Sequence, residues 1–250
     1  MVAQISDLHY GKDLPELPER LLEALDSIAP DLVIVSGDFA QRAWPSEFRK
    51  GRALVDRLPA PWIAIPGNHD IAHFNLVERL FSPLATYHRV ITRERDPTRE
   101  LPGLRVLALN TTRRTTSGRI RDYQLPLIDR LGEGDPDAWR ILVTHHPLTR
   151  KPPQGAEGAL AAAARARVDI LLAGHFHRTV VTTVGDMVSL EAATPISDRA
   201  SPKEIPPWAF NVLRLARATL TFERWASDGG SFSPTEPRAF TRRNAGAPHL

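Results

Sequence analysis

Five short apolar runs in this sequence each end in side chains that bind metal ions. The residues at these ends are Asp7 and His9, Asp38, Asn68 and His69, His145, and His175 and His177. Five of the nine histidines therefore follow an apolar run. Carboxylate, amide and imidazole ligands favour Mn, Fe, Zn or Co, and the absence of cysteine excludes thiolate sites. Because the candidate ligands are too many for one ion, the sequence predicts two.

The runs that precede these ligands are typical of buried strands in an α/β domain. Continuous β-branched and apolar segments predict strands, and apolar residues at helical spacing predict helices between them. The predicted strands are 2–6, 32–35, 62–66, 104–109, 141–144 and 168–173, and the predicted helices are 17–28, 46–58, 75–84, 122–131 and 159–167. This alternation predicts parallel strands whose carboxyl ends meet at one edge, where the ligands would converge.

The remaining segments are predicted to be irregular or antiparallel. Residues 88–103 are highly charged and contain two prolines, so we expect a loop there. Residues 179–192 and 210–225 each carry two strand-like runs separated by a short turn, which predicts two hairpins. We expect one domain over residues 1–225 and a C-terminal tail over 226–250 that is disordered or draped on the surface.

Glycine precedes three of the candidate ligands. Gly37, Gly67 and Gly174 stand directly before Asp38, Asn68 and His175. A glycine lets the backbone turn sharply at a strand end and lets an ion or ligand approach closely. The turns are therefore suited to presenting the ligands rather than only to reversing the chain.

These motifs resemble, in order and identity, the signature of calcineurin-like metallophosphoesterases. The matching blocks are Asp7-x-His9, Gly37-Asp38, Gly67-Asn68-His69-Asp70, His145 and Gly174-His175-x-His177. The resemblance implies an α/β fold, a four-layer α-β-β-α sandwich of two mixed β-sheets flanked by helices. It also implies a two-metal cleft at the strand ends.

The resemblance further implies a role for each residue. Asp7, His9 and His177 would hold one ion, Asn68, His145 and His175 the other, and Asp38 would bridge both. A hydroxide shared by the ions would attack phosphorus in line. His69 would be the catalytic residue, which stabilises charge on the phosphoryl group and protonates the leaving oxygen. Asp70 is left open between an orienting role and a solvated loop acid.

The expected substrate is a small-molecule phosphodiester. The phosphoprotein phosphatase branch carries Asp-Arg-Gly after the second motif and Glu after Gly-Asn-His, whereas this chain has Asp38-Phe39-Ala40 and Asp70. It looks more like the branch that includes class III cyclic-nucleotide phosphodiesterases and glycerophosphodiesterases. A phosphomonoesterase or phosphoprotein phosphatase is the alternative, and a non-catalytic binding scaffold is a third. Asn110, His146 and Arg42 are candidate substrate contacts, and His73, His88 and His249 are expected on the surface.

The composition of the chain limits which binding partners we expect. A net charge of +3 without interleaved aromatic residues does not favour nucleic acid, although a nuclease stays open. No apolar run is long enough to span a membrane, and the N-terminus does not resemble a signal peptide, so we expect a cytoplasmic protein. The C-terminal hairpins and tail could supply a homodimer surface.

Overall fold

The computed structural model describes residues 1–72, 76–114 and 116–242 of the chain, and its main elements are two β-sheets. The first sheet has the strand order β12-β11-β10-β1-β2-β3, with β13 also paired to β11. Strands β1, β2 and β3 are parallel, β10 runs antiparallel to β1, and β11 runs antiparallel to β10. The bounds are β1 (Val2–Ile5), β2 (Leu32–Val35), β3 (Trp62–Ala64), β10 (Trp208–Leu215), β11 (Thr219–Ser227), β12 (Ser233–Pro234) and β13 (Arg238–Thr241).

The second sheet has the order β4-β5-β6-β7-β9-β8. Strands β5, β6, β7 and β9 are parallel, whereas β4 and β8 pair antiparallel at the two edges. The bounds are β4 (Thr98–Leu101), β5 (Leu104–Leu109), β6 (Trp139–Thr144), β7 (Ile170–Ala173), β8 (Val180–Val184) and β9 (Met187–Glu191). Both sheets are therefore mixed, as predicted.

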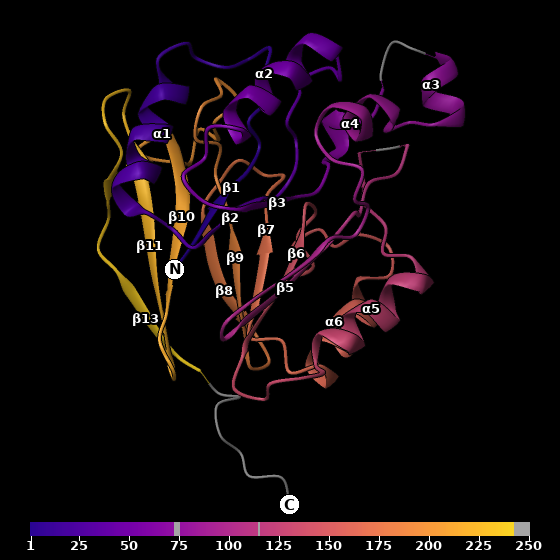
Figure 1. Cartoon of the computed structure of the whole chain (residues 1–250), viewed down its shortest axis with the longest axis vertical. Helices are drawn as coiled ribbons and strands as arrows, with labels where there is room; N and C mark the ends of the chain where they lie inside the picture. The colour runs from indigo at the N-terminus through magenta and orange to yellow at the C-terminus, as the bar shows by residue number, and fades with distance from the viewer. Residues whose placement is uncertain (73–75, 115, 243–250) are drawn as a thin grey trace, which may run out of the picture.

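Helices cover the outer faces of the two sheets (Figure 1). Helices α1 and α2, with α4, pack on the first sheet, and α5 and α6 pack on the second. The short helix α3 precedes α4. The bounds are α1 (Leu17–Ile28), α2 (Pro45–Val55), α3 (Leu76–Phe81), α4 (Ala85–Val90), α5 (Leu125–Leu131) and α6 (Ala156–Arg165).

Strand alternation divides the core into three layers. In β1, Ala3 packs toward the α1 side, whereas Val2 packs between the sheets. In β6, Ile141 joins the layer between the sheets, and Leu142 packs toward α5 and α6. Successive side chains of a strand point to opposite faces, so strands covered on both sides must be apolar throughout. The predicted four-layer sandwich is confirmed.

The predicted loop at 88–103 is the clearest error in the sequence-based assignment. Helix α4 extends to Val90, and β4 occupies Thr98–Leu101 as an edge strand beside β5. Its side chains alternate between half-buried and exposed, so the charged residues lie on a solvated edge. A strand exposed in this way lacks the continuous apolar run that identified the others.

The C-terminal segment continues the first sheet. Residue 225 lies inside β11, and β13 pairs with β11 over Arg238–Thr241. The division of the chain at residue 225 stays a prediction. His73, Asn75 and His249 lie outside the described residues, so two of the histidines expected on the surface and the start of the helix at 75–84 are not described. His88 is half-buried, with its Nδ1 2.9 Å from the carbonyl oxygen of Thr92.

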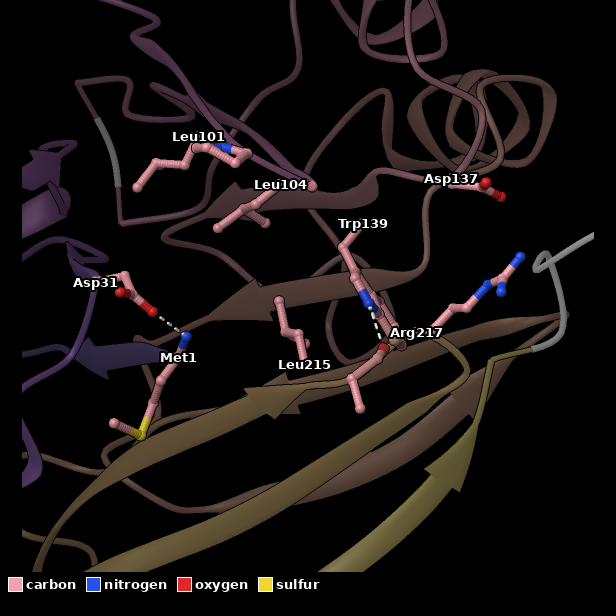
Figure 2. A pocket seen from close by; sticks show the side chains of 11 residues that line it. Met1, Asp31, Leu101, Leu104, Asp137, Trp139, Leu215 and Arg217 are labelled. Carbon is pink, nitrogen blue, oxygen red and sulfur yellow. Dashed lines mark hydrogen bonds and ion pairs between the residues drawn. The ribbon is translucent and has the colours of Figure 1, made fainter.

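A pocket of about 400 Å³ lies at the edge where β1, β2, β5 and β6 begin (Figure 2). Leu104, Trp139 and Leu215 contribute apolar surface, and Met1 and Asp31 form an ion pair at its rim. The indole nitrogen of Trp139 donates a hydrogen bond of 2.9 Å to the carbonyl oxygen of Ala216. None of the described helices combines the length and apolarity needed to cross a bilayer.

Candidate metal centre

The candidate ligands lie together at the opposite edge, where the parallel strands end. Asp7 and His9 follow β1, Asp38 follows β2, and Asn68 follows β3. The second sheet contributes His145 after β6, and His175 and His177 after β7. Backbone hydrogen bonds connect these loops, because Asp7 N donates to Gly37 O and Gly174 N donates to His145 O. The sheets therefore bring distant sequence segments to one site.

Five of the candidate ligands have a left-handed backbone. Their φ angles lie between 45° and 76°, in Asp7, His9, Asp38, His175 and His177. A non-glycine residue held in this region costs about 1 to 3 kcal/mol, and such strain concentrates at functional sites. The surrounding fold must therefore stabilise each of these turns.

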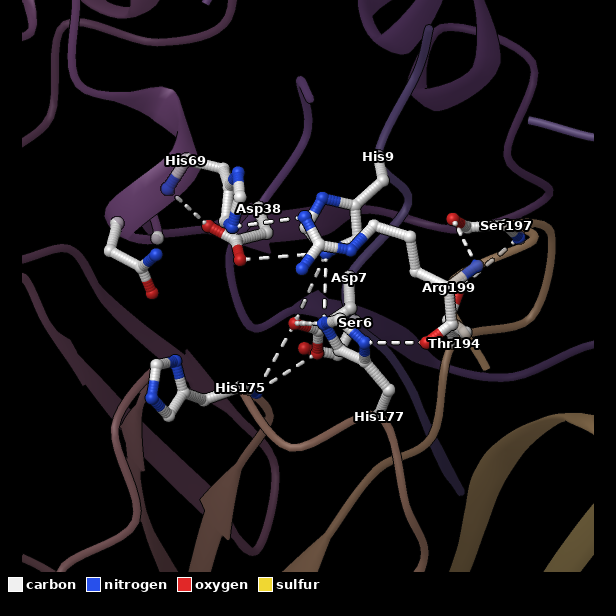
Figure 3. A network of polar contacts seen from close by, with 12 residues as sticks. Ser6, Asp7, His9, Asp38, His69, His175, His177, Thr194, Ser197 and Arg199 are labelled. Carbon is white, nitrogen blue, oxygen red and sulfur yellow. Dashed lines mark hydrogen bonds and ion pairs between the residues drawn. The ribbon is translucent and has the colours of Figure 1, made fainter. Parts of the chain in front are cut away.

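Four side chains form the tightest group. The ligand atoms of Asp7, His9, Asp38 and His177 all lie within 4.8 Å of one another. The Nε2 atoms of His9 and His177 are 2.9 Å apart, and His177 Nε2 is 3.3 Å from Asp7 Oδ1. Figure 3 shows the side chains of these four residues directed toward one another.

A second group adjoins the first. Asn68 Oδ1 lies 3.2 Å from His145 Nε2, and the ring centroids of His145 and His175 are 5.2 Å apart. Figure 3 shows the His175 ring directed away from His177. The backbone nitrogen of His175 donates to the Asp7 carboxylate. His175 therefore connects the two groups through its main chain.

Asp38 lies between the two groups. Its Oδ2 atom is 3.6 Å from His9 Nε2 and 3.4 Å from His145 Nε2. Its Oδ1 atom accepts a 2.8 Å hydrogen bond from the backbone nitrogen of His69. The carboxylate is thus held in a position from which it reaches both sets of ring nitrogens.

Main-chain contacts fix the orientation of two histidines. His177 Nδ1 is 2.7 Å from the carbonyl oxygen of Arg199, and His145 Nδ1 is 2.9 Å from that of Ser36. A carbonyl oxygen only accepts, so each Nδ1 must carry a proton and donate. Burial acts to lower the pKa of both rings, but Asp38 raises that of His145 to about 9 and Asp7 raises that of His177, so a metal ion bound at Nε2 would take the place of a proton there.

The two carboxylates keep their negative charge. Burial alone would raise the pKa of Asp7, but the charge of His177 holds that pKa below its usual range. Burial would also raise the pKa of Asp38, but the charge of His145 holds that pKa well below its ordinary value. Burial lowers the pKa of His9 to about 3, so this imidazole is neutral near pH 7.

His69 is oriented from both sides. Its Nδ1 lies 2.9 Å from the carbonyl oxygen of Gln41, and its Nε2 lies 3.1 Å from Arg199 Nη1. Its ring makes an edge contact with the His9 ring at a centroid distance of 4.8 Å. The imidazole therefore lies against the first group with a fixed direction.

Asp70 is buried, so it is not a solvated loop acid. Its carboxylate accepts hydrogen bonds from the backbone nitrogens of Phe39, Ala40 and Gly67. These bonds connect the loop after β2 with the loop after β3. The orienting alternative is the one that fits this geometry.

Two glycines leave room for the carboxylates. A Cβ atom at Gly67 would lie 2.1 Å from Asp38 Oδ1, and one at Gly174 would lie 2.4 Å from Asp7 Oδ2. Both separations are far shorter than van der Waals contact. Close approach to a carboxylate, rather than turn flexibility alone, therefore requires glycine at these positions.

The residues of the site fit metal ions. The group combines ionised carboxylates, an amide oxygen and ring nitrogens whose lone pairs converge, without thiolates. His9 Nδ1 is buried, yet it has no hydrogen-bond partner in the described part of the chain. The other ring nitrogen, Nε2, faces His177 Nε2 at 2.9 Å and the Asp38 carboxylate at 3.6 Å, and a cation bound between these atoms would be shared by all of them.

The three candidate substrate contacts lie in different surroundings. His146 is buried, with Nδ1 2.8 Å from Thr111 Oγ1 and Nε2 3.0 Å from the Thr116 carbonyl oxygen. Asn110 accepts hydrogen bonds from Thr112 and lines a pocket of about 440 Å³. Arg42 is exposed. Their contact with substrate stays a prediction.

Sequence reasoning did not identify Arg199 or Gln4. Arg199 lies in the irregular segment between β9 and β10, where no motif or periodicity distinguishes it. Gln4 is buried in β1 and donates hydrogen bonds to Ser36 Oγ and to the Ala173 carbonyl oxygen. It therefore ties β1 to the end of β7 beside the site. A buried glutamine within an apolar strand was the available signal.

Known proteins resemble this chain in sequence. A probable cyclic nucleotide phosphodiesterase from Synechococcus is 30% identical over 206 residues, covering 72% of this chain and 74% of that protein. A cAMP/cGMP dual specificity phosphodiesterase from Mycobacterium tuberculosis is 31% identical, covering 78% and 67%. A probable glycerophosphodiester phosphodiesterase from Arcobacter nitrofigilis is 26% identical and covers 78% of each chain.

Solved structures share the fold at lower identity. A purple acid phosphatase from yellow lupin superposes with a TM-score of 0.73 at 14% identity, covering 98% of this chain and 54% of that one. Vps29 from Entamoeba histolytica, in complex with zinc, gives a TM-score of 0.53 at 14% identity, covering 95% and 98%. The family model for calcineurin-like phosphoesterases matches residues 1–179. The chain therefore belongs to the calcineurin-like phosphoesterase family of metal-dependent phosphoester hydrolases.

Proposed function

We propose that this enzyme hydrolyses small phosphodiesters with two metal ions. The position of Asp38 is the observation that carries the proposal. One carboxylate oxygen lies within 3.6 Å of ring nitrogens from both groups, which is the arrangement that a ligand shared by two ions needs. The relatives named as phosphodiesterases favour a diester substrate over a monoester.

Each of the two groups of candidate ligands would hold one ion. Asp7, His9 and His177 would hold one ion, Asn68, His145 and His175 the other, with Asp38 shared. When bound, two such ions supply Lewis acidity toward a phosphoryl oxygen and lower the pKa of water. Mn, Fe, Zn and Co all suit these nitrogen and oxygen ligands.

His69 is the proposed acid for the leaving oxygen. Because Nδ1 donates to the Gln41 carbonyl oxygen, Nε2 is the atom that faces the site. In this structure Nε2 accepts from Arg199 Nη1, so it would have to take up a proton in place of that bond before passing the proton to the leaving oxygen. The bond from its backbone nitrogen to Asp38 Oδ1 keeps the ring beside the shared carboxylate. His69 would therefore act beside the ions rather than as a ligand to them.

A paired assay tests the diester preference. The Mn-loaded protein is given bis(p-nitrophenyl) phosphate and, separately, p-nitrophenyl phosphate. We expect kcat/KM for the diester to exceed that for the monoester by about tenfold or more. A preference for the monoester would replace the proposal with a phosphomonoesterase. Inactivity on both, with no metal bound after purification, would favour a binding scaffold.

Elemental analysis of the purified protein tests the metal number. Two ions per chain are expected, and their identity would follow from the same measurement. One ion per chain would contradict the division of ligands given above. A cytoplasmic location and a homodimer remain predictions from the sequence, which cell fractionation and light scattering would test.

A further inference from the structure

Arg199 extends from the segment between β9 and β10 across the histidine cluster toward His69 (Figure 3). Its backbone is held on both sides. The Arg199 nitrogen donates to Ser197 Oγ at 3.1 Å, and its carbonyl oxygen accepts from His177 Nδ1 at 2.7 Å. The Arg199 main chain is therefore held in place where the side chain begins, and its carbonyl oxygen contacts the candidate ligand His177.

The guanidinium group is only partly used by the protein. Nη1 donates to Gln41 Oε1 at 3.0 Å and lies 3.1 Å from His69 Nε2. Over residues 1–72, 76–114 and 116–242, no carboxylate lies within ion-pair distance of Arg199, and Nε and Nη2 have no protein partner. An arginine carries five N–H donors, so three of them are left over.

Other arginines at this edge of the molecule differ in this respect. Arg150 pairs with the Glu191 carboxylate and stacks on the Phe176 ring. Arg121 donates to the carbonyl oxygens of Asn110 and Thr112. Their guanidinium groups are engaged by the protein, whereas half-buried Arg199 forms no ion pair with any carboxylate in the described part of the chain. A cation held in this way beside a catalytic cluster lacks an anionic partner.

We propose that Arg199 binds the phosphoryl group of the substrate. Its Nε and Nη2 donors form the planar fork that matches two phosphoryl oxygens, while Nη1 stays on Gln41 and keeps the guanidinium beside His69. The same charge offsets the negative charge that develops on the phosphoryl oxygens during hydrolysis. This inference rests on the proposed function, because it assigns a substrate contact within that site.

The test compares three variants of the full chain, each loaded with Mn. Arg199→Ala removes the fork, Arg199→Lys keeps a charge without the fork, and Arg214→Ala removes one positive charge at the opposite edge. KM and kcat are measured with bis(p-nitrophenyl) phosphate, orthophosphate binding by calorimetry, and metal content by elemental analysis.

We expect Arg199→Ala to raise KM and the orthophosphate Kd by about 10- to 100-fold, as for a lost hydrogen bond to a charged group. Arg199→Lys should recover part of the loss. Metal content should not change, because the carbonyl oxygen that holds His177 remains. Arg214→Ala should match the unmodified protein.

Two results would overturn the inference. An unchanged orthophosphate Kd in Arg199→Ala would show that the guanidinium does not bind phosphate. Loss of metal in that variant would show that Arg199 supports His177 instead of the substrate. If the unmodified protein hydrolysed no diester, the proposed function would fail, while orthophosphate binding would still decide the role of Arg199.

Discussion

The same strands have opposite characters at their two ends. Where β1, β2 and β6 begin, they border the pocket of Figure 2, with Leu104, Leu215 and Trp139 in its wall. Where these strands end, they present Asp7, Asp38 and their histidine partners, many of them with a strained backbone. We call these the entry edge and the exit edge.

The difference between the edges has a physical cause. Successive parallel strands are joined by crossovers, so all of their carboxyl ends lie on one side of the sheet. Loops that leave the strands there can turn toward one another without disturbing the apolar layers. At the entry edge, apolar side chains are buried and polar groups bond to main-chain atoms, as the Trp139 indole does to the Ala216 carbonyl oxygen. Changes at the exit edge should therefore alter activity, and changes at the entry edge should alter stability.

The largest effect is expected from His69→Ala at the exit edge. Loss of the proposed leaving-group acid should lower kcat for bis(p-nitrophenyl) phosphate by about 10²- to 10⁴-fold. Both ions should remain bound, because His69 is not a ligand in the proposed site. Elemental analysis beside the kinetics tests both statements. Release of metal from this variant would contradict the division of roles between Asn68 and His69.

The corresponding side-chain truncation at the entry edge is Trp139→Ala. The indole is buried and lies under the guanidinium of Arg242 at 4.6 Å. Its removal should lower the free energy of unfolding by about 3 to 5 kcal/mol. Urea titration measures this, and kcat of the folded fraction should stay unchanged. Trp139→Phe, a milder variant, should lose less stability. A fall in kcat in Trp139→Phe would show that the edges are not independent.

A glycine substitution sharpens the comparison at the exit edge. Gly67→Ala places a methyl group 2.1 Å from Asp38 Oδ1, so the Asp38 carboxylate must move. Metal affinity should fall by about 10- to 100-fold, as when a residue that orients a ligand is changed. Competition with a chelator measures the affinity. Unchanged metal binding would mean that Asp38 can shift without loss.

A glycine-to-alanine substitution at the entry edge, Gly103→Ala, should have the smallest effect. Gly103 has a φ of 71°, and a Cβ atom there would meet nothing within 4 Å. Gly103→Ala should therefore cost only the backbone strain, about 1 kcal/mol. Thermal unfolding measures this cost. Any change in metal affinity would remove the distinction between the two edges.

Sequence patterns predicted most of the fold because the decisive strands are continuous apolar runs. Strand β2, over Leu32–Val35, is buried on both faces, and such a run has few alternative structures. Strand β4 escaped prediction because it is an edge strand with charged residues on its solvated side. Helix α4 was not predicted because its short apolar pattern borders a charged segment.

The candidate ligands were identified in the sequence by residue type and by their position after strands. The ionised state of Asp38, the tautomers of His145 and His177 and the strained turns could not be identified, because each depends on a contact between distant segments. Ser36 and Arg199 supply carbonyl oxygens to these histidines, and no sequence spacing relates either pair.

The stretch Gly67-Asn68-His69-Asp70 shows both contributions. The sequence by itself determined an amide, an imidazole and a carboxylate after a glycine at a strand end, because local chemistry sets the types and the turn. Only the tertiary structure decided their surroundings. It places Asp38 against Gly67, buries Asp70 under three backbone nitrogens and brings Arg199 to His69. Packing of the two sheets creates these contacts, and sequence spacing carries no information about it.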